Sequence, residues 1–226
     1  GSLVKLHERN YSTKVIRPKP TVFHSPDLNM IVIMTCWGES SFKDRIFEEI
    51  QKFVFAAEGD VEVTSPFEMN TYLSRNCNFL RMCTLLINDL IYRGENRDSY
   101  KSCYELTILY KKDNKFSWVQ VGTPNLYLFK DKLIPLSVSV PLAYSMTPNA
   151  LPLPQQYLGT EMHCHFQLGE IVVDSNQKVL LFSETSLYKD TWGLNAADFN
   201  LDRLMKNQIQ LDPESPFWMA IIDFKD

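Results

Sequence analysis

The chain has 226 residues, of which 45% are hydrophobic and 22% are charged, and its formal net charge is -4. This size and composition are typical of one globular unit with a substantial core, so we expect a single domain over residues 1–226. The weakly acidic net charge gives no sign of the clustered basic face that nucleic-acid binding requires, so we do not expect DNA or RNA binding. No apolar run approaches the ~18 residues that span a bilayer, so we expect no membrane segment.

The first predicted elements are a buried strand and two helices. An apolar run over residues 31–39 reaches a tight turn at Gly38, which predicts a strand that ends there. Apolar residues recur at helical spacing over 42–57, with charged residues opposite, and again over 68–93. We therefore expect a strand followed by a pair of amphipathic helices.

After Gly94 the periodicity changes to two, with β-branched and aromatic residues, so residues 102–136 are predicted to form a β-meander. Residues 141–160 hold four prolines and no periodicity, which predicts a long surface loop. The remaining expected elements are strands at 161–173 and 178–183, a helix at 198–209 and a last strand at 217–224. This order favours an α/β layered (α+β) fold in which helices flank the sheets.

Five short segments carry a family resemblance. Residues 7–12 read His-Glu-Arg-Asn-Tyr-Ser, 35–39 read Thr-Cys-Trp-Gly-Glu, 122–125 read Gly-Thr-Pro-Asn, 183–187 read Ser-Glu-Thr-Ser-Leu, and 214–217 read Glu-Ser-Pro-Phe. In this order they resemble the metal-dependent serine/threonine protein phosphatases, the type 2C or PPM family. That family has Arg-x-x-Asn-Glu-Asp, Asp-Gly-x-Gly-Gly, Gly-Asp-Ser-Arg, Ser-Asp-Gly-Leu and Asp-Asn-x-Thr at these places. The resemblance implies a PPM phosphatase-like β-sandwich flanked by helices.

The resemblance also implies a degenerate catalytic cleft, because the family's metal-binding aspartates are missing. Thr35 stands where the family's bridging carboxylate would sit, Ser12 stands at another acidic position, and Pro216 lies where the last aspartate is expected. Glu184 keeps a carboxylate with one more methylene, and Glu39 would add a second only if it turned inward. Magnesium and manganese need carboxylate oxygens, so we predict no metal, no cofactor and no catalytic residue.

Other positions complete the expected cleft. His7 takes the place of the family's basic phosphate ligand, Asn10 is kept, and Gly38 keeps the turn glycine. Trp37 replaces a small residue, and it is expected either to plug the vacated cleft or to anchor a partner as an aromatic hot spot.

Several residues have a structural as well as a functional interpretation. Glu184 is expected to cap a following helix rather than to remain as a metal ligand. Cys36 is expected to be a small buried hydrophobe rather than a nucleophile, which would need a lowered pKa and a nearby base. In the run 163–165, His-Cys-His, alternation along a strand would place both histidines on one face, and two ligands do not make a zinc site. The five cysteines are odd in number and scattered, which favours reduced thiols and a cytoplasmic location.

Three functions remain open from the sequence. The first is a catalytically inactive pseudophosphatase that acts as a protein-binding, scaffolding or regulatory module in signalling. The second is a metal-dependent phosphatase with altered ligands, drawn from Glu39, Glu184, Asp190 and Asp223. The third is a small-ligand sensor that uses the remodelled cleft. For the first, Tyr144 and Leu151 in the 141–160 loop are candidate partner-binding residues, because the loop is too apolar for an idle solvated segment; alternatively these side chains fold back onto the sheet.

Overall fold

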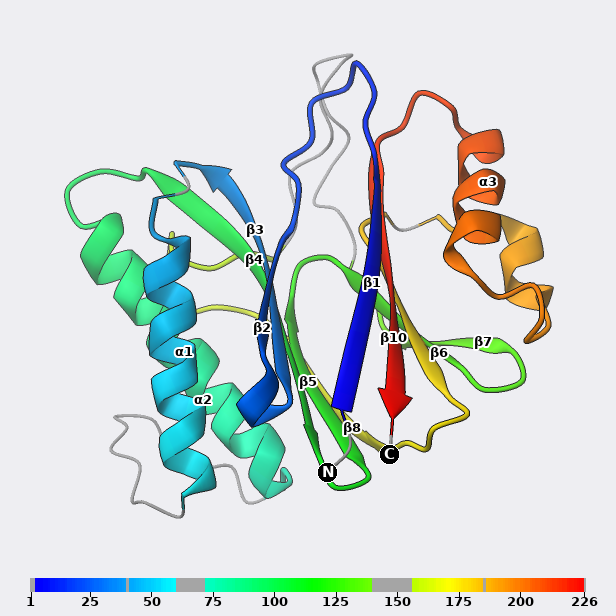
Figure 1. The fold of residues 1–226 in the computed structure, drawn as a ribbon. Coiled ribbons are helices and arrows are strands. Elements are labelled where there is room, and N and C mark those ends of the chain that lie inside the picture. Colours follow the sequence, from blue (N-terminus) through cyan, green and yellow to red (C-terminus); the bar gives the residue numbers. More distant parts are fainter. Residues whose placement is uncertain (1–2, 40, 60–71, 140–155, 185, 226) are drawn as a thin grey trace. The chain divides into compact units, whose positions relative to one another are not determined.

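The computed structural model describes residues 3–39, 41–59, 72–139, 156–184 and 186–225 (Figure 1). These residues form a mixed α+β structure with two five-stranded antiparallel sheets and three α-helices. The chain divides into two compact units, each built on one sheet. Unit 1 comprises Gly1–Lys19, Gly122–Gln155 and Val173–Asp226, and unit 2 comprises Pro20–Val121 and Gln156–Val172.

Unit 2 contains the sheet β2-β3-β4-β5-β8 and the helices α1 and α2. The strands are β2 (Thr21–Ser25), β3 (Met30–Gly38), β4 (Ser102–Lys112), β5 (Lys115–Val121) and β8 (Gln167–Val172), and the helices are α1 (Lys43–Glu58) and α2 (Arg75–Leu90). Alternate residues of β4 from Tyr104 to Tyr110 pack with the buried faces of both helices in one core. The predicted strand before Gly38 and the predicted helix over 42–57 are confirmed.

The second predicted helix is shorter than the expected range of 68–93. Residues 72–74 are not helical, and α2 begins at Arg75 because the Ser74 hydroxyl accepts a hydrogen bond of 3.1 Å from the Cys77 amide. A serine at the N-cap satisfies one of the free amides of the first turn. After Leu90 the chain continues as a single π-helical turn, Ile91–Glu95, before it leads into β4.

Unit 1 contains the sheet β1-β10-β9-β6-β7, with α3 (Leu201–Leu211) against it. Its strands are β1 (Leu3–Tyr11), β6 (Asn125–Phe129), β7 (Leu133–Ser137), β9 (Lys178–Phe182) and β10 (Phe217–Lys225). Aromatic and aliphatic side chains of β6, β9 and β10 form a second core with Leu201 and Leu204 of α3. The last predicted helix and the last predicted strand are confirmed, whereas β1 and β2 were not predicted.

The expected β-meander over 102–136 is instead two hairpins that belong to different sheets. The β4–β5 hairpin lies in unit 2 and the β6–β7 hairpin lies in unit 1. The chain changes sheet at Gly122, whose φ of 74° is unfavourable for other residues, and at Pro124, which has no amide hydrogen for a strand ladder. The meander prediction was wrong because these two residues end the first hairpin.

The strand predicted over 161–173 is confined to Gln167–Val172, so residues 163–165 precede it. Most of the expected 141–160 loop, including Tyr144 and Leu151, lies outside the described residues; of its last part, Leu158 is buried and exchanges backbone hydrogen bonds with Tyr104 of β4. In the described parts of the chain, no helix combines the length and the apolarity that crossing a bilayer would need.

Candidate functional site

In unit 2, the candidate site begins at the end of β3, where the family resemblance places a bridging carboxylate. Thr35 is 2% exposed, and among the described residues its Oγ1 has no hydrogen-bond partner. In the antiparallel register Thr35 lies opposite Glu105 of β4. Glu105 is 1% exposed, so a carboxylate is buried one strand away from the position where the sequence predicts one to be lost.

Trp37 extends this site along the same face of β3. Its indole Nε1 donates a hydrogen bond of 2.7 Å to Oε1 of Glu105, and the side chain is only partly exposed. A buried carboxylate needs such donors, because desolvation without them is costly. The indole of Trp37 therefore has a hydrogen-bond partner within unit 2 itself. This favours packing within the protein over the alternative that Trp37 anchors a partner protein.

The turn after Trp37 depends on a glycine. Gly38 has a φ of 121°, and a Cβ at this position would lie 2.3 Å from the backbone oxygen of Lys101. The next residue, Glu39, donates its amide to that same oxygen at 3.1 Å. Glu39 is exposed, and its backbone, rather than its carboxylate, contacts Lys101 and the Cys36 thiol.

Cys36 points to the opposite face of β3 and packs against the helix-covered core. Its thiol donates to the Glu39 carbonyl at 3.0 Å. Burial raises the pKa of this thiol, a hydrogen bond from Tyr104 lowers it, and the Glu95 carboxylate raises it. A thiol with a raised pKa is a poor nucleophile, so the structure agrees with the expectation of a packing role.

In unit 1, the candidate site is centred on Glu184, just after β9. Its Oε1 lies 2.5 Å from Nη1 of Arg17 in an ion pair whose side chains are 12% exposed for the arginine and 23% exposed for the glutamate. A second guanidinium nitrogen, Nη2, donates to the backbone oxygen of Ser183 at 2.6 Å. The expectation that Glu184 caps a helix was wrong, because the next helical turn starts at Lys189 and its N-cap, Tyr188, makes no side-chain cap.

Neighbouring polar side chains fix the backbone of this turn. The Ser183 hydroxyl accepts a hydrogen bond from the Trp218 amide at 2.8 Å, and the Ser183 amide donates to the Trp218 carbonyl at 3.0 Å. Asn125 donates to the Glu184 carbonyl at 2.9 Å and accepts from the Ser139 amide at 2.8 Å. Asn125 ends the Gly-Thr-Pro-Asn segment, so this degenerate motif still supports the Glu184 turn.

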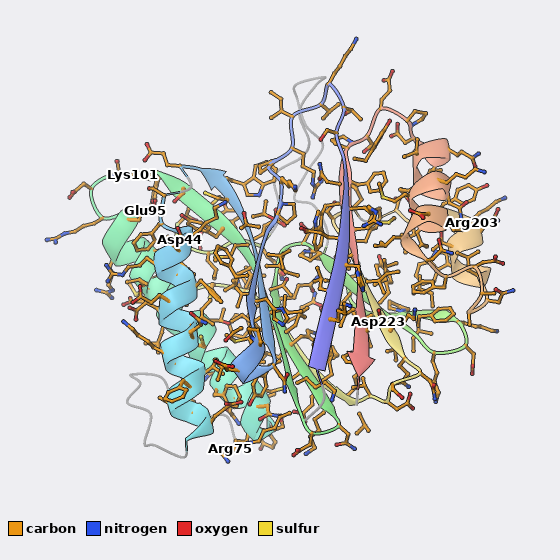
Figure 2. All side chains as sticks on the ribbon, in the orientation of Figure 1. Asp44, Arg75, Glu95, Lys101, Arg203 and Asp223 are labelled. Carbon is orange, nitrogen blue, oxygen red and sulfur yellow. The ribbon has the colours of Figure 1, made fainter. Side chains whose placement is uncertain are left out.

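The N-terminal motif residues of unit 1 fall into two groups. Asn10 donates to the Ser12 hydroxyl at 3.0 Å, and both residues are exposed. His7 lies on β1 with its Nε2 3.7 Å from the Asp223 carboxylate, and Lys178 approaches the same carboxylate at 3.4 Å. Asp223 lies on β10 (Figure 2). His7 and Asn10 are three residues apart on β1, and side chains alternate along a strand, so the two side chains lie on opposite faces. The structure therefore brings Asn10 and Ser12 together but not His7.

The remaining candidates contribute little chemistry. Pro216 is buried just before β10 and offers no ligand atom on its side chain. His163 and His165 are exposed while Cys164 turns toward the core, although this run does not lie on a strand as expected. Within the described ranges, no three His, Cys, Asp or Glu side chains are grouped so that they could hold a metal ion.

Two residues of these sites were missed by the sequence reasoning. Glu105 could have been noticed as an acidic residue inside the apolar strand pattern of 102–110. Arg17 gives no local signal, because it lies in an irregular segment 167 residues away from its partner Glu184.

No protein-family profile and no curated protein sequence matches this chain. Solved structures do match: a PPM Ser-Thr phosphatase, MsPP from Mycobacterium smegmatis in complex with cacodylate, is 12% identical with a TM-score of 0.63 over 99% of both chains. PppA, a regulatory component of the T6SS in Pseudomonas aeruginosa, is 14% identical with a TM-score of 0.61 over 99% of this chain and 100% of its own. The catalytic domain of the phosphatase PstP with two manganese ions is 12% identical with a TM-score of 0.60 over 100% of both chains.

The fold is that of the PPM phosphatases. These likenesses cover both units of the chain, and the resemblance inferred from the five motifs is thereby confirmed at the level of the fold.

The PstP catalytic domain is described in complex with two manganese ions. Divalent metals of this kind need several anionic oxygens. Thr35 offers a neutral hydroxyl, the Glu184 carboxylate is already neutralised by Arg17, and Glu105 receives the Trp37 indole. Taken by itself, each unit thus has one described carboxylate at its candidate position, and that carboxylate already contacts a donor: Trp37 for Glu105 in unit 2 and Arg17 for Glu184 in unit 1.

Proposed function

We propose that this protein is a catalytically inactive PPM-type phosphatase, a pseudophosphatase, that acts as a protein-binding or regulatory module in the cytoplasm. The observation that carries the proposal is the buried hydroxyl of Thr35, the residue that the motif resemblance matches to the family's bridging carboxylate. A protein with this fold but without the metal-binding carboxylates would not hydrolyse phosphate esters. We therefore propose that its activity is the binding of a partner. The five cysteines, all free thiols, support a reducing compartment.

The chemical reason is electrostatic. A bridged two-metal centre provides the attacking hydroxide and neutralises the phosphate, but two dications repel each other unless carboxylates lie between them. A threonine hydroxyl carries no charge and does not offset that repulsion. The single carboxylate at the Glu184 turn is paired with a guanidinium instead.

Hydrolysis of para-nitrophenyl phosphate over a range of Mg²⁺ and Mn²⁺ concentrations tests the inactivity. The expected result is no turnover above a buffer blank, with the PstP catalytic domain as the positive control. Turnover that rises with Mn²⁺ and disappears in Glu184→Ala would overturn the proposal.

Partner binding is the second part of the proposal, and the 141–160 segment is its candidate surface. The segment combines prolines with aromatic and aliphatic residues, and prolines limit the entropy lost when a segment orders on a partner. One protein of the same fold, PppA, is itself described as a regulatory component.

The test is recovery of partners from the native host by Tyr144→Ser with Leu151→Ser, compared with the unaltered protein. Loss of a specific partner at an unchanged melting temperature supports an interaction surface. A large drop in melting temperature would mean that the two residues belong to a core, and the segment would then not be the binding surface.

A metal-dependent phosphatase with altered ligands is a second candidate, and one observation favours it. Glu105 places a buried carboxylate opposite Thr35, so charge lost on β3 is partly regained on β4. If this carboxylate binds a metal, Mn²⁺-dependent turnover should be present and should vanish in Glu105→Gln. In that case Glu184→Ala would have a smaller effect than Glu105→Gln.

A further inference from the structure

The Glu184 turn is bound by a cation that belongs to the protein itself. The Arg17 guanidinium uses two nitrogens to contact two oxygens of this turn, Oε1 of Glu184 at 2.5 Å and the backbone oxygen of Ser183 at 2.6 Å. A carboxylate with a backbone carbonyl is the oxygen set that hard divalent cations use in proteins. The arginine thus engages oxygens of the kind that a metal ion would bind.

The contacts of Arg17 are directed at this turn. Among the described residues, its third donor, Nε, is buried without a hydrogen-bond partner. A buried donor without a partner costs free energy, so the position of Arg17 is not the one that would satisfy all three of its nitrogens. Its position is explained by the two contacts to Ser183 and Glu184.

We propose that Arg17 is a built-in replacement for a metal ion at the Glu184 turn and that it excludes divalent cations from these two oxygens. The proposal deepens the proposed function and rests on it for the match between Glu184 and the family's metal-binding aspartate. A guanidinium is charged at every physiological pH, and its planar fork suits two neighbouring oxygens. As a tethered group it competes at a high effective concentration, on the order of millimolar or above, with a free ion that would find a single carboxylate.

The test compares the unaltered protein with Arg17→Met and with the double variant Arg17→Met, Glu184→Gln. Methionine keeps much of the length of the side chain and removes the charge. Each protein is melted with and without MnCl₂, and Mn²⁺ binding is measured by calorimetry. Neither readout depends on catalysis.

We expect Arg17→Met to gain Mn²⁺ binding, because the positive charge that contacts both oxygens is removed. At an ion concentration ten times Kd, binding to the folded state alone raises the melting temperature of a protein of this size by roughly 3–6 °C. The unaltered protein should not shift, and the double variant should not shift either because the carboxylate is gone.

Two results would overturn the proposal. If the unaltered protein shifts with Mn²⁺ as much as Arg17→Met does, the arginine excludes nothing. If Arg17→Met binds no Mn²⁺ at 10 mM, about ten times the ~1 mM dissociation constant of the weakest calcium sites, the two oxygens are not a latent cation site. Should Arg17→Met fail to fold, Arg17→Gln carries the same comparison, since glutamine also removes the positive charge and keeps a polar side chain.

The phosphatase assay separates this inference from the proposed function. Hydrolysis by the unaltered protein would overturn the proposal that the protein is inactive. It would not decide whether Arg17 excludes Mn²⁺, which the binding comparison tests separately. Absence of hydrolysis together with Mn²⁺ binding by the unaltered protein would sink the role of Arg17 alone.

Discussion

Trp37 and Glu105 are joined across the strand pair β3–β4 by a hydrogen bond of 2.7 Å from the indole Nε1 to the carboxylate Oε1. Because Glu105 is 1% exposed, this donor satisfies a carboxyl oxygen that is buried inside the protein. The residue that departs most from the family motif is thus tied to an acidic residue that the motif comparison does not include.

Replacing Trp37 with phenylalanine should destabilise the protein by about 1–3 kcal/mol, because a buried carboxylate loses a donor. Urea denaturation of Trp37→Phe, Glu105→Gln and the double variant measures the coupling between the two side chains. We expect a coupling of roughly 1–2 kcal/mol, since the neutral amide needs the indole less. Purely additive effects would show that the bond contributes nothing beyond packing.

The turn at Gly38 should not tolerate a side chain. In Gly38→Ala the Cβ would meet the Lys101 carbonyl at 2.3 Å and the residue would hold a φ of 121°, so a loss of about 2–4 kcal/mol is expected. Gly94→Ala is the matched control, because a Cβ at Gly94 would meet no heavy atom within 4 Å and alanine favours a helical turn by about 0.5–1 kcal/mol. Equal melting temperatures for the two variants would contradict this account.

Asn96 should be the most sensitive polar residue around the π-helical turn. It is 5% exposed, its Nδ2 donates to the carbonyls of Ser102 and Gly159 at 2.7 Å each, and its Oδ1 accepts from the amides of Lys101 and Ser102. Asn96→Ala leaves four backbone groups, three of them in buried hydrogen bonds, without this partner, which should cost about 2–4 kcal/mol in denaturant unfolding. The exposed Asn176, changed to alanine, should stay within about 0.5 kcal/mol of the unaltered protein. A similar small effect in both variants would refute the importance of the Asn96 network.

Alkaline pH should weaken the fold partly through Cys164. Burial raises the pKa of this thiol to about 11, above its ordinary value of 9.0. The unfolded chain therefore loses the thiol proton first, so the contribution of Cys164 to stability is complete below pH 9 and is lost as pH rises toward 11. Partial exposure reduces the size of the effect.

Urea midpoints measured from pH 8 to pH 11 should fall less steeply in Cys164→Ala than in the unaltered protein. Other groups, including the tyrosines, titrate in both proteins, so only the difference between the two curves reports on this thiol. Parallel curves would mean that the thiol does not titrate differently on folding.

The parts of the fold that could be predicted from the sequence are those with one buried face and a local period. The strand before Gly38 and the helix α1 have such a pattern, and each was located to within one residue or two. β1 was missed because most of its middle residues, from His7 to Asn10, are exposed and polar, so the strand depends on pairing with β10. A strand defined by a distant partner has no local signature.

The differences between the candidate site and the family motifs can be read from the sequence, but the contacts of its residues cannot. The absence of aspartates at Thr35 and Ser12 is visible in the letters alone. The pairing of Arg17 with Glu184 needs the tertiary fold, because 167 residues separate them. The change of sheet at Gly122 could not be predicted either. The hairpins before and after it both have a period of two, and this period does not tell which sheet a strand joins.

The pairing of β1 with β10 has a consequence for biogenesis. β1 lies at the edge of its sheet, and its one neighbour in that sheet is β10, the last of the ten described strands to leave the ribosome. The Trp218 indole and the Glu8 carboxylate, which bond across these strands at 2.8 Å, are 210 residues apart in the chain. The backbone groups of β1 that pair with β10 therefore have no strand partner until β10 has been synthesised. Unpaired strands of this kind can pair wrongly or be bound by chaperones. Nascent chains that end before β10 should be captured by a holdase, and chains extended past it should be released.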